Sequence, residues 1–146
     1  NPESHDVALL VVDDDSMICW DLVQKIGLLL ESKGINVAPS FFTAPFVTDG
    51  LFDRVYEGEP AEVRRLELSR HVDGLVFGKK SVSYVDNPEL QDIITANVLV
   101  KLHFISAETG LIEDSFTIEQ SGAGFSSAAA ENMAVEGVLV MIEERM

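Results

Sequence analysis

The sequence predicts a single-domain α/β fold with a mixed sheet, in the order βαβαβββα, and with the helices packed on the sheet. In the first half, a strand, a helix and a second strand follow closely, which implies a parallel crossover. In the second half, long alternating strands are joined by short turns, which is typical of antiparallel hairpins. The length of 146 residues suits one domain. We therefore expect one domain over residues 1–146, with residues 1–6 as a disordered tail.

The composition bounds the classes of partner. Ten Lys and Arg residues stand against 25 Asp and Glu residues, so the formal net charge is −15. Nucleic acid would be repelled by that field, and we expect no nucleic-acid partner. The single cysteine, Cys19, excludes an intramolecular disulfide. No apolar run approaches the ~18 residues that a membrane-spanning helix needs, so no direct membrane span is predicted.

The first elements follow from short-range patterns. Residues 7–12 (VALLVV) are apolar and partly β-branched, which predicts a strand that is covered on both faces. Helical spacing of apolar residues then predicts a helix over 17–33, capped by Asp15 or Ser16. Residues 35–38 are expected to form the second strand.

The segment over residues 40–59 is irregular and holds four of the eight phenylalanines. It predicts a loop and one short helix, followed by a helix over 61–70 behind Pro60. Phe41, Phe42 and Phe46 are candidates for a partner-binding surface, because aromatic anchors carry much of the energy of interfaces. The alternative is that these rings fold back over a sheet edge or a helix.

Period-2 patterning dominates the second half. Residues 74–85 form a predicted strand, and over 95–105 apolar and polar residues alternate, which indicates a sheet with one buried face. A hairpin turn is expected at Glu108-Thr109-Gly110. A further strand with Ile112, Phe116 and Ile118 on its buried face should follow.

A glycine-rich segment precedes the last predicted helix. Residues 121–124 are expected to form a turn, with Ser126 or Ser127 as the helix cap. Small residues in the apolar stripe of that helix predict close packing on the sheet. Gly122, Gly124 and Ser126 are candidates for a ligand or anion turn, since backbone N–H groups at a helix start can bind anions. The alternative is a plain capping turn.

An acidic triplet follows the first strand, at the sheet edge where ligands bind in open α/β folds. Asp13 and Asp14 could hold Mg²⁺ through carboxylate oxygens, whereas the alternative is a solvated loop. The opening residues 9–37 resemble the start of a two-component receiver domain. The third strand, over 74–79, ends without the phosphoacceptor Asp of that family. The three histidines share no metal-ligand spacing and no nucleophile elbow is present, so no catalytic residue is predicted.

Three segments carry a second resemblance, which covers most of the chain. They are residues 72–78 (VDGLVFG), the hairpin over 98–115 with its Glu-Thr-Gly turn, and residues 121–127 (SGAGFSS) before an Ala-rich helix. Together they resemble the periplasmic α/β domain family of CsgG, LpoB, FlgT and the TolB N-terminal domain. The Asp-rich loop departs from that family's pattern, and Cys19 does not correspond to the lipid-bearing cysteine of several members.

The resemblance implies a function without catalysis and without a cofactor. We expect a protein-interaction or assembly domain of a bacterial cell-envelope protein, periplasmic or associated with the outer membrane. The implied partner is another envelope protein, or a second copy in a homo-oligomer. The alternative is a receiver-like or Mg²⁺-binding signalling domain that uses the acidic loop, with a cytoplasmic location.

Overall fold

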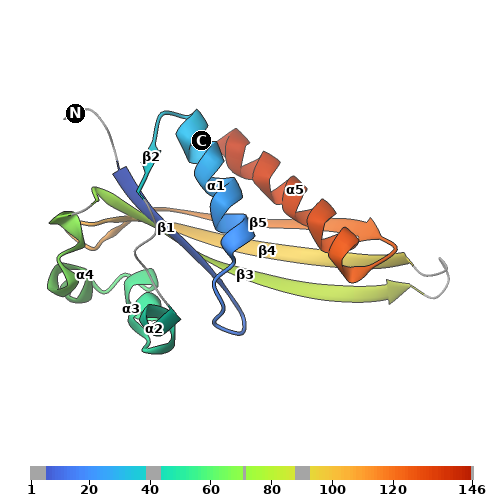
Figure 1. Cartoon of the computed structure of the whole chain (residues 1–146), viewed down its shortest axis with the longest axis horizontal. Coiled ribbons are helices and arrows are strands. Elements are labelled where there is room, and N and C mark those ends of the chain that lie inside the picture. Colours follow the sequence, from blue (N-terminus) through green and yellow to red (C-terminus); the bar gives the residue numbers. More distant parts are fainter. Residues whose placement is uncertain (1–5, 39–43, 71, 88–92, 146) are drawn as a thin grey trace. The chain divides into compact units, whose positions relative to one another are not determined.

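The computed structural model describes residues 6–38, 44–70, 72–87 and 93–145 (Figure 1). Its five strands form one mixed sheet in the order β2-β1-β3-β4-β5, with helices packed against it. This confirms the predicted fold class. The contacts divide the chain into two compact units. The first unit contains Asn1–Lys79 and Leu102–Ser115, and the second contains Lys80–Lys101 and Phe116–Met146.

The first unit begins with the predicted crossover. Strand β1 (Asp6–Asp13) is buried over its central residues on both faces, and β2 (Asn36–Val37) pairs with it in parallel. Helix α1 (Trp20–Ser32) connects the two strands. Its buried residues are Leu22, Ile26, Gly27 and Leu30. The strand starts at Asp6, so the predicted tail is wrong at that residue, and residues 1–5 lie outside the described part.

The connection between β1 and α1 differs from the prediction. Helix α1 starts at Trp20 rather than residue 17, and its N-cap is Cys19, with no side-chain cap. The chain first makes a hairpin-like turn in which Val12 and Ile18 form an antiparallel bridge. Ser16 adopts a left-handed φ of 61° inside this turn. The predicted cap by Asp15 or Ser16 is therefore wrong, because the turn uses both residues before the helix begins.

Short helices follow where a loop and two helical segments were expected. They are α2 (Ala44–Thr48), α3 (Leu51–Tyr56), α4 (Pro60–Leu66) and the 3₁₀ helix η1 (Leu68–Arg70). These helices begin or end next to residues whose backbone is in the left-handed conformation. Gly50 and Gly58 each have φ of 82°, and Glu67 ends α4 with φ of 53°. The predicted helix over 61–70 is thus shorter, since a residue in that conformation cannot continue an α-helix.

These helices cover the core of the first unit. Phe52, Val55 and Val63 are at most 1% exposed. They belong to one cluster with strand residues that include Leu10, Leu75, Phe77 and Ile105. The rings of Phe52 and Phe77 are stacked, with centroids 5.0 Å apart. Burial of aromatic side chains on this scale is a main source of the unit's stability.

The three remaining strands are long, and each contributes to both units. They are β3 (Gly74–Asn87), β4 (Ile93–Ser106) and β5 (Ile112–Gly124). In β4, Ala96, Val98 and Val100 are fully buried while Lys101 is exposed, which confirms the predicted alternation over this part of the strand. The alternation does not extend to residue 105, because Phe104 is only partly buried and Ile105 is 1% exposed. In β5, Ile118 is buried as predicted, but Ile112 is 39% exposed.

The hairpin between β4 and β5 turns at the predicted place. The Gly110 N–H donates to the Ser106 carbonyl over 2.8 Å, and the Ser106 N–H donates to the Leu111 carbonyl over 3.0 Å. Gly110 has a φ of 77°, and a Cβ there would lie 2.5 Å from the Pro60 Cα. Both the left-handed backbone and the lack of space require glycine at this position.

In the second unit, helix α5 (Ser127–Arg145) packs closely on β5. The predicted turn over 121–124 is wrong, because β5 continues through Gly124. A Cβ on Gly122 would lie 2.4 Å from the Ala134 nitrogen. The glycines therefore let the helix backbone approach the strand, and the predicted close packing is confirmed. The Ser126 hydroxyl accepts the Ala129 N–H over 3.1 Å, as the capping prediction requires.

Candidate functional site: a pocket, an acidic turn and two exposed helix faces

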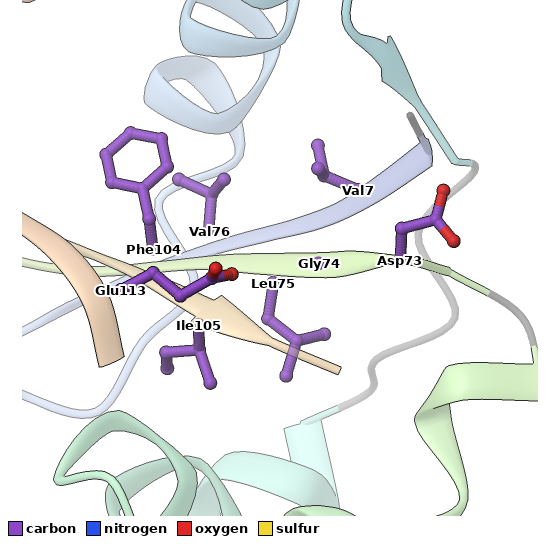
Figure 2. Close-up of a pocket in the computed structure, with 8 residues that line it drawn as sticks. All are labelled: Val7, Asp73, Gly74, Leu75, Val76, Phe104, Ile105 and Glu113. Carbon is purple, nitrogen blue, oxygen red and sulfur yellow. The ribbon is translucent and has the colours of Figure 1, made fainter. Parts of the chain in front are cut away.

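A small pocket lies in the first unit, where β1, β3, β4 and β5 meet (Figure 2). It has a volume of about 190 Å³ and is lined by Val7, Asp73, Gly74, Leu75, Val76, Phe104, Ile105 and Glu113. The lining is mainly apolar, and the two carboxylates lie apart from each other in Figure 2. The volume is below the roughly 300–1,000 Å³ of small-molecule sites. The pocket could hold a small apolar group, and it brings no nucleophile and base together.

The acidic turn uses its first carboxylate for its own structure. Asp13 Oδ1 accepts the backbone N–H of Asp15 over 2.9 Å and that of Met17 over 3.0 Å. Among the residues that the structure describes, no group of three or more His, Cys, Asp or Glu side chains could hold a metal ion. Mg²⁺ binding by Asp13 and Asp14 stays a prediction.

Replacing Asp13 with alanine should loosen the turn. The substitution removes the acceptor of two backbone N–H groups, so we expect the free energy of unfolding to fall by about 1–2 kcal/mol. Chemical denaturation monitored by circular dichroism measures this change. Asp15→Ala is the matched control, since its exposed carboxylate should contribute less than about 0.5 kcal/mol. Equal effects of the two substitutions would show that the Asp13 hydrogen bonds do not hold the turn.

A second polar cluster of the first unit surrounds Tyr56, the last residue of α3. The His103 ring stacks on the Tyr56 ring at a centroid distance of 4.0 Å, and His103 Nδ1 donates to the Tyr56 carbonyl over 2.7 Å. Lys79 Nζ lies 4.7 Å from the centre of the Tyr56 ring and 3.0 Å from Asp53 Oδ1. The histidine thus satisfies a carbonyl at the helix end that has no partner within the helix. The arrangement fastens α3 to the sheet.

Burial raises the pKa of the Tyr56 hydroxyl above its ordinary value of 10.0. The folded state therefore keeps the proton after the unfolded chain has begun to lose it. The contribution of Tyr56 to the free energy of unfolding is therefore fully present below pH 10 and is lost as the pH rises through the folded-state pKa. We expect Tyr56→Phe to reduce the alkaline loss of stability, measured by urea denaturation on both sides of that pH. Tyr84→Phe, at a residue 48% exposed, is the control for removing a tyrosine hydroxyl and should change the free energy of unfolding at neutral pH by less than about 0.5 kcal/mol.

The predicted aromatic surface is only partly described. Phe41 and Phe42 lie outside the described residues. Phe46, in α2, is partly buried against the core and meets Phe77 edge to face, with ring centroids 6.0 Å apart. Phe46 is thus folded back, but onto the central strand β3 and not over a sheet edge or a helix, as the alternative had it. A partner-binding role for the three residues stays a prediction, as does anion binding at Gly122, Gly124 and Ser126.

Large apolar side chains are instead exposed on the two longest helices and beside them. Trp20 and Leu28 on α1 are 54% and 66% exposed, and Met17 just before the helix is 64% exposed. In the second unit, Met133 and Val140 on α5 are also more than half exposed, and Phe125 just before it is 81% exposed. Sequence reasoning missed both faces, although helical spacing places Trp20 and Leu28 away from the side of the helix that carries Leu22, Ile26 and Leu30.

No family model and no curated protein matches the sequence. Several solved structures do share the fold. Lipoprotein GNA1162 from Neisseria meningitidis superposes with a TM-score of 0.56 at 12% identity, over 97% of this chain and 94% of that one. The hypothetical protein CT253 from Chlamydia trachomatis gives a TM-score of 0.57 at 10% identity, over 96% of both chains. The PelC dodecamer from Paraburkholderia phytofirmans gives 0.53 at 13% identity, over 91% of this chain and 82% of that one.

The comparisons define a class by fold: the chain has an α/β architecture that also occurs in a bacterial lipoprotein and in the subunit of a bacterial dodecamer. At these identities the likeness concerns the fold alone. In the part of the chain that the structure describes, no helix is both long and apolar enough to cross a membrane.

Proposed function

We propose that this chain is a non-catalytic interaction or assembly domain of a bacterial cell-envelope protein, similar to the CsgG, LpoB and TolB N-terminal group. Its partner would be another envelope protein or further copies of itself, in the periplasm or at the outer membrane. The observation that carries the proposal is the exposure of large apolar side chains on the outer faces of α1 and α5. Exposed apolar surface of this kind is typical of sites of protein association.

Two further observations support a binding function. The pocket is small and mainly apolar, which suits neither a polar substrate nor an acid–base pair. The fold is shared with a protein described as a lipoprotein and with one described as a dodecamer, so assembly in the envelope is compatible with this architecture.

Fractionation of the source cells tests the location. An antibody against this domain should detect the native protein in the periplasmic or outer-membrane fraction. The same fractions, run on a native gel after chemical crosslinking, should contain it in a complex larger than the monomer. Recovery only in the cytosol would contradict the proposal, and Mg²⁺ and phosphodonor titrations of the Asp13–Asp15 turn would then be the next measurement. Recovery in the envelope only as a monomer would contradict the assembly part.

A further inference from the structure

Met17, Trp20 and Leu28 are large exposed apolar residues of the first unit on and just before α1, and we call them together the α1 face. Trp20 begins α1, and Leu28 lies two turns further, about 12 Å along the helix axis. The opposite side of the helix carries Leu22, Ile26 and Leu30, all at most 3% exposed. Those three residues account for the packing of α1, so the α1 face contributes little to folding.

The turn before α1 holds this face in a fixed geometry. The Cys19 N–H donates to the Val11 carbonyl over 2.8 Å, and the Asp13 N–H donates to the Met17 carbonyl over 2.9 Å. Together with the hydrogen bonds of the Asp13 side chain, these hydrogen bonds fix the backbone conformation around Met17 and Trp20. A surface that is already ordered loses less conformational entropy on binding. Tryptophan is also the residue type most enriched among the energetic centres of interfaces.

The charges near the α1 face favour a partner with cationic side chains. Asp15 and Asp21, both exposed, are sequence neighbours of Met17 and Trp20, and Lys25 is the exposed cation on the same helix. The whole chain carries a net charge of −15, which opposes the approach of a second copy to this surface. A cationic side chain would be attracted by the carboxylates and could also lie over the Trp20 ring.

We propose that the α1 face docks an amphipathic helix of a partner protein, with apolar side chains on Met17, Trp20 and Leu28 and with Arg or Lys toward Asp15 and Asp21. Trp20 and Leu28 are eight residues apart, about 12 Å along the axis, which is close to the ~10.5 Å between the i and i+7 anchors of a helix lying along α1. This inference rests on the proposed function and names the surface and the chemistry of its partner.

Trp20 allows a direct test, because it is the only tryptophan of the chain. The purified protein is titrated with a synthetic amphipathic peptide that has leucine on one face and arginine on the other. The control peptide carries glutamate in place of arginine. The arginine peptide should shift the Trp20 emission to shorter wavelength in a saturable manner and bind at least tenfold more tightly than the control. Added salt should weaken the binding, because exposed charges are screened.

Variants locate the binding through the anisotropy of a labelled arginine peptide. Asp21→Asn and Leu28→Ala should each weaken binding about tenfold. The matched controls lie elsewhere in the first unit: Asp49→Asn and Leu111→Ala also change an exposed carboxylate and an exposed aliphatic side chain, and should leave it unchanged. All four sites are exposed, so the variants should fold.

Three results would overturn the inference. They are the absence of any emission shift with the arginine peptide, equal binding of both peptides, and equal effects of the α1 variants and their controls at Asp49 and Leu111. An emission shift with phosphatidylcholine vesicles but with neither peptide would assign the face to a lipid surface and would equally overturn it. Envelope location and complex formation in the fractionation experiment are independent of this outcome, so either proposal can fail without the other.

Discussion

Replacing Gly122 with alanine is expected to lower the free energy of unfolding by about 3 kcal/mol. The new Cβ would lie 2.4 Å from the Ala134 nitrogen and 2.5 Å from the Ala130 oxygen. Both are backbone atoms of α5, so no side chain can rotate to relieve the overlap, and the whole helix must move away from β5. Thermal and urea denaturation, followed by circular dichroism, measure the loss.

Gly137→Ala is the matched control within α5 itself. The nearest atom to a Cβ at Gly137 is the Gln120 side-chain oxygen, 3.3 Å away, and that flexible side chain can shift. Alanine is also favoured over glycine inside a helix by about 1 kcal/mol. We therefore expect this variant to be as stable as the wild type or more stable. A Gly122 variant of wild-type stability would show that α5 does not approach β5 as closely as described.

Phe77→Ala should cost about 3–5 kcal/mol of stability, the usual range for deleting a fully buried aromatic ring. Phe77 is 0% exposed and contacts two other rings of the first unit, those of Phe46 and Phe52. Its loss leaves a cavity beneath α2 and α3 that these short helices cannot close without losing their own contacts. The midpoint of urea denaturation gives the magnitude.

Phe125→Ala controls for the general effect of removing a phenylalanine. That ring is 81% exposed, and its removal should change stability by less than about 0.5 kcal/mol. If the two variants lost similar amounts of stability, Phe77 could not be part of the core. Partner binding is measured separately from stability, and the Phe125 variant can differ from the wild type in binding although the two have the same stability.

The sheet could be predicted from the sequence wherever its faces differ in polarity. Alternation over residues 95–105 indicated β4, and the VALLVV run indicated a strand buried on both faces. Local patterns suffice in these places, because each strand's burial imposes its own periodicity. The Ser126 cap and the Glu-Thr-Gly hairpin turn were predicted for the same reason, since their hydrogen bonds are short-range.

Other features depend on contacts between distant residues. The turn before α1 is held by the bridge from Val12 to Ile18, and a helix start at residue 17 was the simpler reading of the local sequence. Gly122 and Gly124 resemble a turn in isolation, whereas α5 makes them strand residues.

The candidate site was harder to predict than the fold. Stacking between His103 and Tyr56 joins residues 47 positions apart, which no single-sequence pattern reveals. The α1 face follows from knowing which side of the helix is already buried. Composition indicated only that nucleic acid should not be the partner.

The division of the strands between the two units also determines when each unit can fold during synthesis. The first unit needs residues 102–115 in addition to its first 79, and the second resumes at residue 116. A chain emerging from the ribosome therefore cannot finish the first unit until residues 80–101 of the second have also been made. No single cut in the polypeptide can release either unit without part of the other. We expect truncated chains that end between residues 80 and 101 to expose unpaired strands and to be recognised by chaperones and proteases during synthesis.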